Sequence, residues 1–169
     1  MISQLLLLVI LPALLATAAG WDLASFTIPN FLSLALAGTF VLFALTLRFS
    51  PFLAGLHLLA GFIGLALGFT LFALGYIGGG DAKLYAAIGL WLGPHDLLIY
   101  SFVAAILGGV LTLAILGLRQ LPLPAGLTRQ DWILKLHDER SGIPYGVALA
   151  AAAVVILPQT EILRLAAGG

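Results

Sequence analysis

Long apolar runs without any charged residue constrain this chain more than any other feature. Uncharged stretches cover residues 2–21, 23–47, 49–80 and 97–118, and the third contains one histidine. A helix needs about 20 apolar residues to cross roughly 30 Å of hydrocarbon, and each run reaches that length. Spanning segments must satisfy their own backbone hydrogen bonds, and the alternating pattern of barrel strands is absent. The sequence therefore predicts an all-α, polytopic membrane protein.

Turn residues and run lengths divide the chain into a bundle of about six transmembrane helices. We expect them within one membrane-embedded domain over residues 1–169, at 2–21, 29–47, 52–74, 82–93, 97–118 and 143–160. Pro29 fits just inside the start of the second helix, where its missing N–H costs nothing. Residues 48–51 and 93–96 are expected to form tight hairpins. The fourth segment is short, so it either tilts or continues into the preceding glycine loop.

Composition excludes several classes of function. Lys and Arg together number 7 and Asp and Glu 7, so no basic surface for nucleic acid is predicted. The absence of cysteine excludes disulfides, thiolate metal sites and cysteine nucleophiles. The three histidines are too scattered for an ordinary zinc site. Residues 16–18 resemble a signal-peptide cleavage site, but residues 1–5 carry no basic charge, so the first run is interpreted as a membrane span.

The distribution of basic residues predicts the orientation in the membrane. With the N-terminus outside, Arg48 and Arg164 lie outside and five basic residues lie inside: Lys83, Arg119, Arg129, Lys135 and Arg140. The inside loops are then residues 22–28, residues 75–81 and the long polar loop 119–142. In that loop Thr128 and Asp131 predict a helix start, and the following residues form either a helix on the membrane surface or an ordinary solvated loop.

Small residues form a stripe along the third segment, at Gly61, Gly64, Gly68 and Gly75, which permits close helix packing. His57 lies on the same stripe, near the expected outer end. A proton relay through His57 is one interpretation. A packing or hydrogen-bonding role is favoured, because most of the bilayer separates it from the acidic residues at the inner end.

Two carboxylates, Asp22 and Asp81, are expected at the inner ends of the first and fourth segments. Acidic groups at such positions are costly and indicate function. Asp81 also fits a helix N-cap, whereas Asp22 follows its expected helix, where a negative charge opposes the helix dipole. Considered as a pair at matched depth, the two residues favour function.

Two carboxylates close together in a low-dielectric site cannot both be ionised, so they share one proton. One then acts as the base that activates water, and the other is the acid that protonates an amide. This chemistry is that of an aspartic protease, and no cofactor or metal is expected. Gly78, Gly79 and Gly80 lack side chains, so a substrate backbone can come close to Asp81.

Three motifs in order carry a resemblance to a known family. The sequence GGGDAKLYAAIGLWLGP, which begins with a GxGD motif at residues 78–81, resembles the second active-site segment of type IV prepilin peptidases. The stretch WDLASFTIPN resembles their first active-site segment. Residues 143–148, IPYGVA, resemble a later stretch of the same family. The set covers nearly the whole chain.

The resemblance implies an intramembrane aspartic endopeptidase with Asp22 and Asp81 as catalytic residues. It implies removal of leader peptides from prepilins or pseudopilins at the cytoplasmic face of the bacterial inner membrane. Without cysteines or space for an N-methylation domain before the first segment, the chain looks like the compact type associated with tight-adherence (Flp, type IVb) pili. The lipid bilayer is an expected partner, and a homo-oligomer is possible.

Other residues are candidates for contacts with substrate. Lys83 is either an anchor at the membrane interface, a contact for a substrate carboxylate, or a charge beside one aspartate. The resemblance departs at residues 23–27, where basic residues common in the family are missing, so Asp138 and Glu139 become candidates for binding a basic leader. Asn30 is expected to bond the backbone of the 21–30 join.

Two other functions remain open on the sequence alone. In a proton-relay transport subunit, Asp22 and Asp81 would conduct protons, although such relays usually place further carboxylates near the membrane centre. In a non-catalytic assembly partner of a secretion system, the same residues would only cap helices.

Overall fold

The computed structural model describes residues 1–124, 126 and 129–168, and all regular structure in these ranges is helical. The predicted all-α membrane protein is confirmed. The elements in chain order are α1 (Ile2–Leu5), η1 (Leu6–Ile10), α2 (Leu11–Ser25), α3 (Asn30–Thr46), α4 (Pro51–Ala73), α5 (Gly79–Arg119), α6 (Asp131–His137), α7 (Tyr145–Ile156), η2 (Leu157–Gln159) and α8 (Glu161–Ala167).

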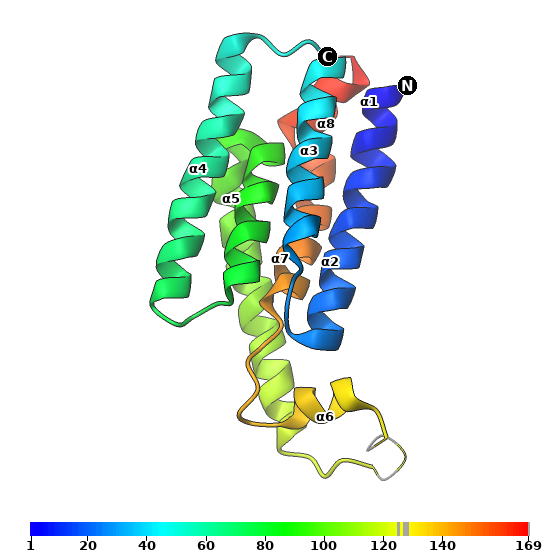
Figure 1. Cartoon of the computed structure of the whole chain (residues 1–169), viewed down its shortest axis with the longest axis vertical. Helices are drawn as coiled ribbons and strands as arrows, with labels where there is room; N and C mark the ends of the chain where they lie inside the picture. The colour runs from blue at the N-terminus through cyan, green and yellow to red at the C-terminus, as the bar shows by residue number, and fades with distance from the viewer. Residues whose placement is uncertain (125, 127–128, 169) are drawn as a thin grey trace.

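Several helices are long and apolar enough to cross a membrane. Three pass this test singly, namely Ile2–Ser25, Pro51–Ala73 and Gly79–Arg119. The helices Tyr145–Gln159 and Glu161–Ala167 pass only when taken together, and a bend of 52° lies between them. Figure 1 shows these helices lying side by side, with α5 beside α4 and α7 beside α2. The chain is therefore a multi-pass membrane protein.

The long helix α5 is in fact two helices that fold back on each other. Gly93 has a left-handed backbone (φ 72°, ψ 177°) that breaks the helix, and Pro94 follows it. The rings of Tyr85 and Tyr100 stack with centroids 5.4 Å apart, although a straight helix would separate them by roughly 22 Å. Figure 1 shows the chain reversing direction within α5. The hairpin expected at 93–96 is thus a reversal between two arms, residues 79–92 and 94–119.

His57 on α4 stabilises this reversal. Pro94 has no N–H to offer the carbonyl of Leu90, and the Nδ1 of His57 lies 2.7 Å from that carbonyl oxygen. A carbonyl only accepts, so Nδ1 is the donor. The ring also stacks on Phe40, with centroids 5.3 Å apart. His57 therefore satisfies a buried carbonyl and packs between α3 and α5, which is the role that the sequence favoured.

Replacing His57 by alanine is expected to lower the free energy of unfolding by about 1–3 kcal/mol, because the Leu90 carbonyl loses its buried donor. His95→Ala is the comparison variant, since the His95 side chain is 65% exposed and its partner Asp96 keeps the hydrogen bond from the Glu161 N–H. Thermal unfolding in detergent measures both. Loss of activity in His57→Ala with unchanged unfolding would instead support the proton-relay role.

The glycine stripe of α4 packs against the first arm of α5. A Cβ on Gly68 would lie 2.9 Å from Ala82 Cα, and one on Gly64 would lie 3.2 Å from Ala86 Cα. These approaches leave no room for side chains, as the stripe predicted. Gly75 does not belong to the stripe: it lies beyond the end of α4 with φ 78°, where it reverses the chain in open space.

The helical run that corresponds to the expected last segment, 143–160, ends at Gln159, and a further helix follows it. α7 ends at Ile156, a 3-10 turn follows, and α8 begins at Glu161 after Thr160. The buried side chain of Asp96 accepts a hydrogen bond from the Glu161 N–H (2.8 Å), so a carboxylate from the 93–96 reversal caps α8. The C-terminal part of the chain is thus tied to the same end of the bundle as His57.

The loop after α5 carries the short helix α6, which Figure 1 places beyond one end of the bundle. Its described start is Asp131 with Gln130 as the N-cap residue, while Thr128, the expected start signal, lies outside the described residues. Trp132 and Leu134 are exposed apolar residues on this helix. This exposure is compatible with the predicted helix on a membrane surface.

Candidate active site

Asp22 lies inside α2, in its last turn. We expected the first helix to end near residue 21, but it continues to Ser25. Phe26 caps it: this residue has a left-handed backbone (φ 60°), and its N–H donates to the Asp22 carbonyl. Hydropathy shows where the apolar run ends, but it does not show where the helix ends. The Asp22 side chain is only 3% exposed. A carboxylate buried this deeply requires hydrogen-bond partners.

Asp81 lies in the first turn of α5, which begins three residues earlier than the expected 82. Gly78 is the N-cap residue and its N–H donates to Asp81 Oδ2 (2.9 Å), so the carboxylate closes the helix start from within. The side chain is 6% exposed. Its other oxygen, Oδ1, is buried and has no hydrogen-bond partner among the described residues. Capping therefore uses one oxygen and leaves the second available.

The two carboxylates meet at the start of α7. The N–H of Gly146 donates to Asp22 Oδ2 (2.7 Å), across 124 residues of sequence. The same N–H lies beside Asp81, and the charges of Asp22 and Asp81 are close enough to interact. The first N–H groups of a helix have no partner within that helix, so α7 offers a donor at this point. The structure thus brings Asp22 and Asp81 together in one buried site.

Close packing fixes the positions of these three elements. A Cβ on Gly146 would lie 2.8 Å from Asp22 Oδ2 and 2.5 Å from Ile28 Cδ1. A Cβ on Gly80 would lie 3.0 Å from Ile28 Cβ and 3.1 Å from the Ile28 backbone nitrogen. Ile28, which precedes Pro29 in the α2–α3 join, therefore lies between α5 and α7. Glycine is required on both sides of it.

The glycines before Asp81 have different neighbours. Ile28 occupies the space where a side chain at position 80 would lie, so the absence of a side chain at Gly80 allows close packing. Gly79 faces the ring of Phe72 at ordinary contact distance, and Gly78 is close only to the Asp81 carboxylate. Of the three glycines, Gly80 packs against the Ile28 backbone and Gly78 is the one beside the carboxylate.

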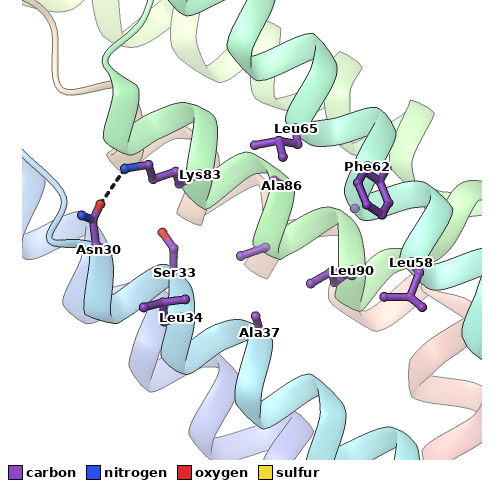
Figure 2. Close-up of a pocket in the computed structure, with 12 residues that line it drawn as sticks. Asn30, Ser33, Leu34, Ala37, Leu58, Phe62, Leu65, Lys83, Ala86 and Leu90 are labelled. Carbon is purple, nitrogen blue, oxygen red and sulfur yellow. Dashed lines mark hydrogen bonds between the residues drawn. The ribbon is translucent and has the colours of Figure 1, made fainter.

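Lys83 lies on another face of α5. It is two positions after Asp81, which places the side chains roughly 160° apart around the helix. Its ammonium donates to Asn30 Oδ1 (2.8 Å), as Figure 2 shows. Asn30 was expected to bond backbone, so this part of the interpretation was wrong. Asp138 and Glu139 are exposed, and Asp138 accepts a hydrogen bond from the Arg140 N–H.

Arg119 is a residue whose role the sequence did not predict. At the end of α5 its guanidinium donates to three backbone carbonyls of the segment that leads into α7, namely Leu136 (2.9 Å), Ser141 (3.0 Å) and Gly142 (3.1 Å). Gly146 follows four residues after this anchored segment. Gly146 itself belongs to the IPYG stretch noted in the sequence, but no contact with Asp22 was predicted.

No group of three or more His, Asp or Glu side chains is arranged to hold a metal ion within the part of the chain that the structure describes. The site therefore offers two carboxylates and backbone donors as its chemical groups.

Comparison with models of known protein families identifies the family of this chain. Residues 9–113, more than half of the chain, match the family model described as the type IV leader peptidase family. The chain belongs to the type IV leader peptidase family. This family membership makes it a membrane protease of the prepilin leader peptidase type. The search of curated proteins and the search of solved structures each found no match.

The matched residues of this leader peptidase include Asp22, Asp81 and Ile28, but they end before α7. Gly146, which contacts Asp22, thus lies outside the matched region.

Proposed function

We propose that this leader peptidase is an aspartic endopeptidase in which Asp22 and Asp81 form the catalytic pair. The observation that carries the proposal is their convergence: two buried carboxylates from α2 and α5 interact beside the Gly146 N–H. Two buried carboxylates that interact favour sharing one proton, so one is assigned as a base and the other as an acid. Both groups that an attack of water on an amide needs are then present.

In the proposed reaction, the ionised carboxylate accepts a proton from water as the water oxygen attacks the scissile carbonyl carbon. The protonated carboxyl group donates its proton to the carbonyl oxygen, and collapse of the tetrahedral intermediate transfers a proton to the leaving nitrogen. Asp81 Oδ1, which has no partner among the described residues, is available to hold the water. The N–H groups of Gly78 and Gly146 hold Asp81 Oδ2 and Asp22 Oδ2 in place.

The proposed substrate is a prepilin or pseudopilin, with its scissile peptide entering beside Gly78 and Gly79. The tight-adherence (Flp, type IVb) class is proposed on the resemblance of the sequence to compact members of the family. The proposed location is the bacterial inner membrane with the site at the cytoplasmic face, supported by the excess of basic residues in the loops at that end. Lys83 is not included in the reacting centre because it lies on another face of α5.

Reconstitution into liposomes tests this function against a proton relay. The purified protein is expected to remove the leader from a tight-adherence prepilin, giving one product whose mass corresponds to a single cleavage. A pH-sensitive dye inside the same liposomes is expected to report no protein-dependent proton flux. Proton flux without cleavage of any prepilin supplied would contradict the proposal and favour the relay.

A further inference from the structure

A groove on the side of α5 away from Asp81 is not used by the proposed reaction. It has a volume of about 500 Å³ and lies between α3 and α4, with the first arm of α5 as its floor. Figure 2 shows the side chains that line it. Its lining is apolar except for Asn30, Ser33 and Lys83, all near one end. The volume falls within the range of about 300–1,000 Å³ for small-molecule sites.

The polar end of the groove offers donors and a positive charge. Lys83 is exposed, and its hydrogen bond to Asn30 Oδ1 leaves the Asn30 amide nitrogen as a further donor. Within the described residues the one ion pair joins His95 and Asp96, so no acidic side chain there neutralises Lys83. The mouth of the groove thus favours an anion.

Ser33 is an independent indication of a ligand. Its side chain lines the groove, the residue is 9% exposed, and its Oγ has no hydrogen-bond partner among the described residues. Hydroxyls in apolar helices normally bond the carbonyl four residues earlier, as Thr39 and Thr70 do here. Figure 2 shows the Ser33 oxygen pointing into the space between α3 and α5. A buried hydroxyl without a partner costs free energy that a ligand acceptor would restore.

The groove covers only part of the membrane thickness. From Lys83 to Leu90 it is roughly 10 Å long, compared with roughly 15 Å for the hydrocarbon of one leaflet. Beyond Leu90 the rings of Phe40, His57 and Trp91 close the gap between α3 and α4. A peptide helix that crosses the bilayer would meet this closed end, whereas a chain from one leaflet would stop before it.

The polar groups are ordered by depth as in a phospholipid. Asn30 and Lys83 lie at the mouth, and Ser33, three residues further along α3, is roughly 4.5 Å deeper. Beyond Ser33 the lining is wholly apolar, and its small residues Ala37 and Ala87 leave space for a hydrocarbon chain. In a phospholipid the phosphate, the ester carbonyl and the acyl chain follow one another in the same order.

We propose that this groove binds one anionic phospholipid from the leaflet on the Lys83 side. Its phosphate contacts the ammonium of Lys83 and the Asn30 amide, an ester carbonyl accepts from Ser33 Oγ, and one acyl chain lies along Ala37 and Ala87. This site is separate from the carboxylate pair and does not depend on the proposed protease function.

Native mass spectrometry of the full chain in detergent tests the proposal. Phosphatidylglycerol is expected to bind with a stoichiometry of one and about five-fold more tightly than phosphatidylcholine, the effect of one lysine near an anionic headgroup. Lys83→Gln is expected to remove this preference. Ser33→Ala is expected to weaken the binding of both lipids several-fold. Phosphatidylglycerol is also expected to raise the unfolding temperature of the wild-type protein.

Ala37→Phe fills the groove and is expected to abolish the bound lipid together with the rise in unfolding temperature. Gly38→Phe is the control, because the adjacent position on α3 faces open space. Equal binding of both lipids, or full retention of phosphatidylglycerol in Ala37→Phe, would overturn the proposal. A raised KM for prepilin in Ala37→Phe with lipid binding unchanged would overturn it too, since the occupant would then be the apolar segment of the substrate.

Discussion

Asp81→Asn and Asp22→Asn are each expected to lower the rate of leader cleavage by about 10²–10⁴-fold, the usual contribution of a general acid or base. Asparagine keeps the shape, and its carbonyl oxygen still accepts the hydrogen bonds from Gly78 and Gly146 that the structure shows. It neither accepts a proton from water nor donates one as a carboxyl group does. The variants therefore separate acid–base chemistry from capping.

The measurement is the single-turnover cleavage rate of a purified prepilin by the reconstituted variants. Glu161→Gln is the control, because this carboxylate is exposed and lies at the start of α8, beside the 93–96 reversal at the other end of the bundle. Wild-type rates in both site variants would refute the catalytic pair. Equal membrane levels and unfolding temperatures are needed to assign the loss to chemistry.

Gly146→Ala is expected to lower the cleavage rate at least about ten-fold and to destabilise the protein by about 1–3 kcal/mol, the usual cost of overpacking. The new Cβ would lie 2.8 Å from Asp22 Oδ2 and 3.1 Å from Asp22 Cγ, so the carboxylate or α7 must move. A misplacement of about 1 Å costs on the order of 10²-fold where geometry determines the rate.

The control for this variant is Gly142→Ala, in the same segment, where an added Cβ meets nothing within 4 Å. Helix propensity alone would make alanine at position 146 stabilising by about 1 kcal/mol, since residue 146 lies in α7. Raised stability with an unchanged cleavage rate in Gly146→Ala would show that the contact with Asp22 does not contribute to cleavage. Unfolding and cleavage are measured on the same preparations.

The helices themselves could be predicted from the sequence, because hydrocarbon imposes length and internal hydrogen bonding on each segment. Their ends could not. Apolar runs stop at Trp21 and resume after Asp81, but the helices include both aspartates, since a helix end is set by local caps such as Phe26 and Gly78. The reversal at Gly93 was foreseen because glycine and proline act locally there.

The pairing of Asp22 with Asp81 was predicted from depth and from a family resemblance, and the structure brings them together. The contact of Gly146 with Asp22 was not predicted, because it joins residues 124 positions apart and depends on the packing of Ile28. The groove beside Ser33 was also missed. Its existence depends on the separation of three helices, which no local pattern encodes.

The central claim, that Asp22 and Asp81 act as one catalytic unit, is tested most directly by a double-mutant cycle on the cleavage rate. When two groups share one proton, replacing either of them removes the same catalytic step. The double variant Asp22→Asn/Asp81→Asn is therefore expected to cleave no more slowly than the slower single variant. Additive losses, with the double variant slower by the product of the two single factors, would contradict the account and show two independent contributions.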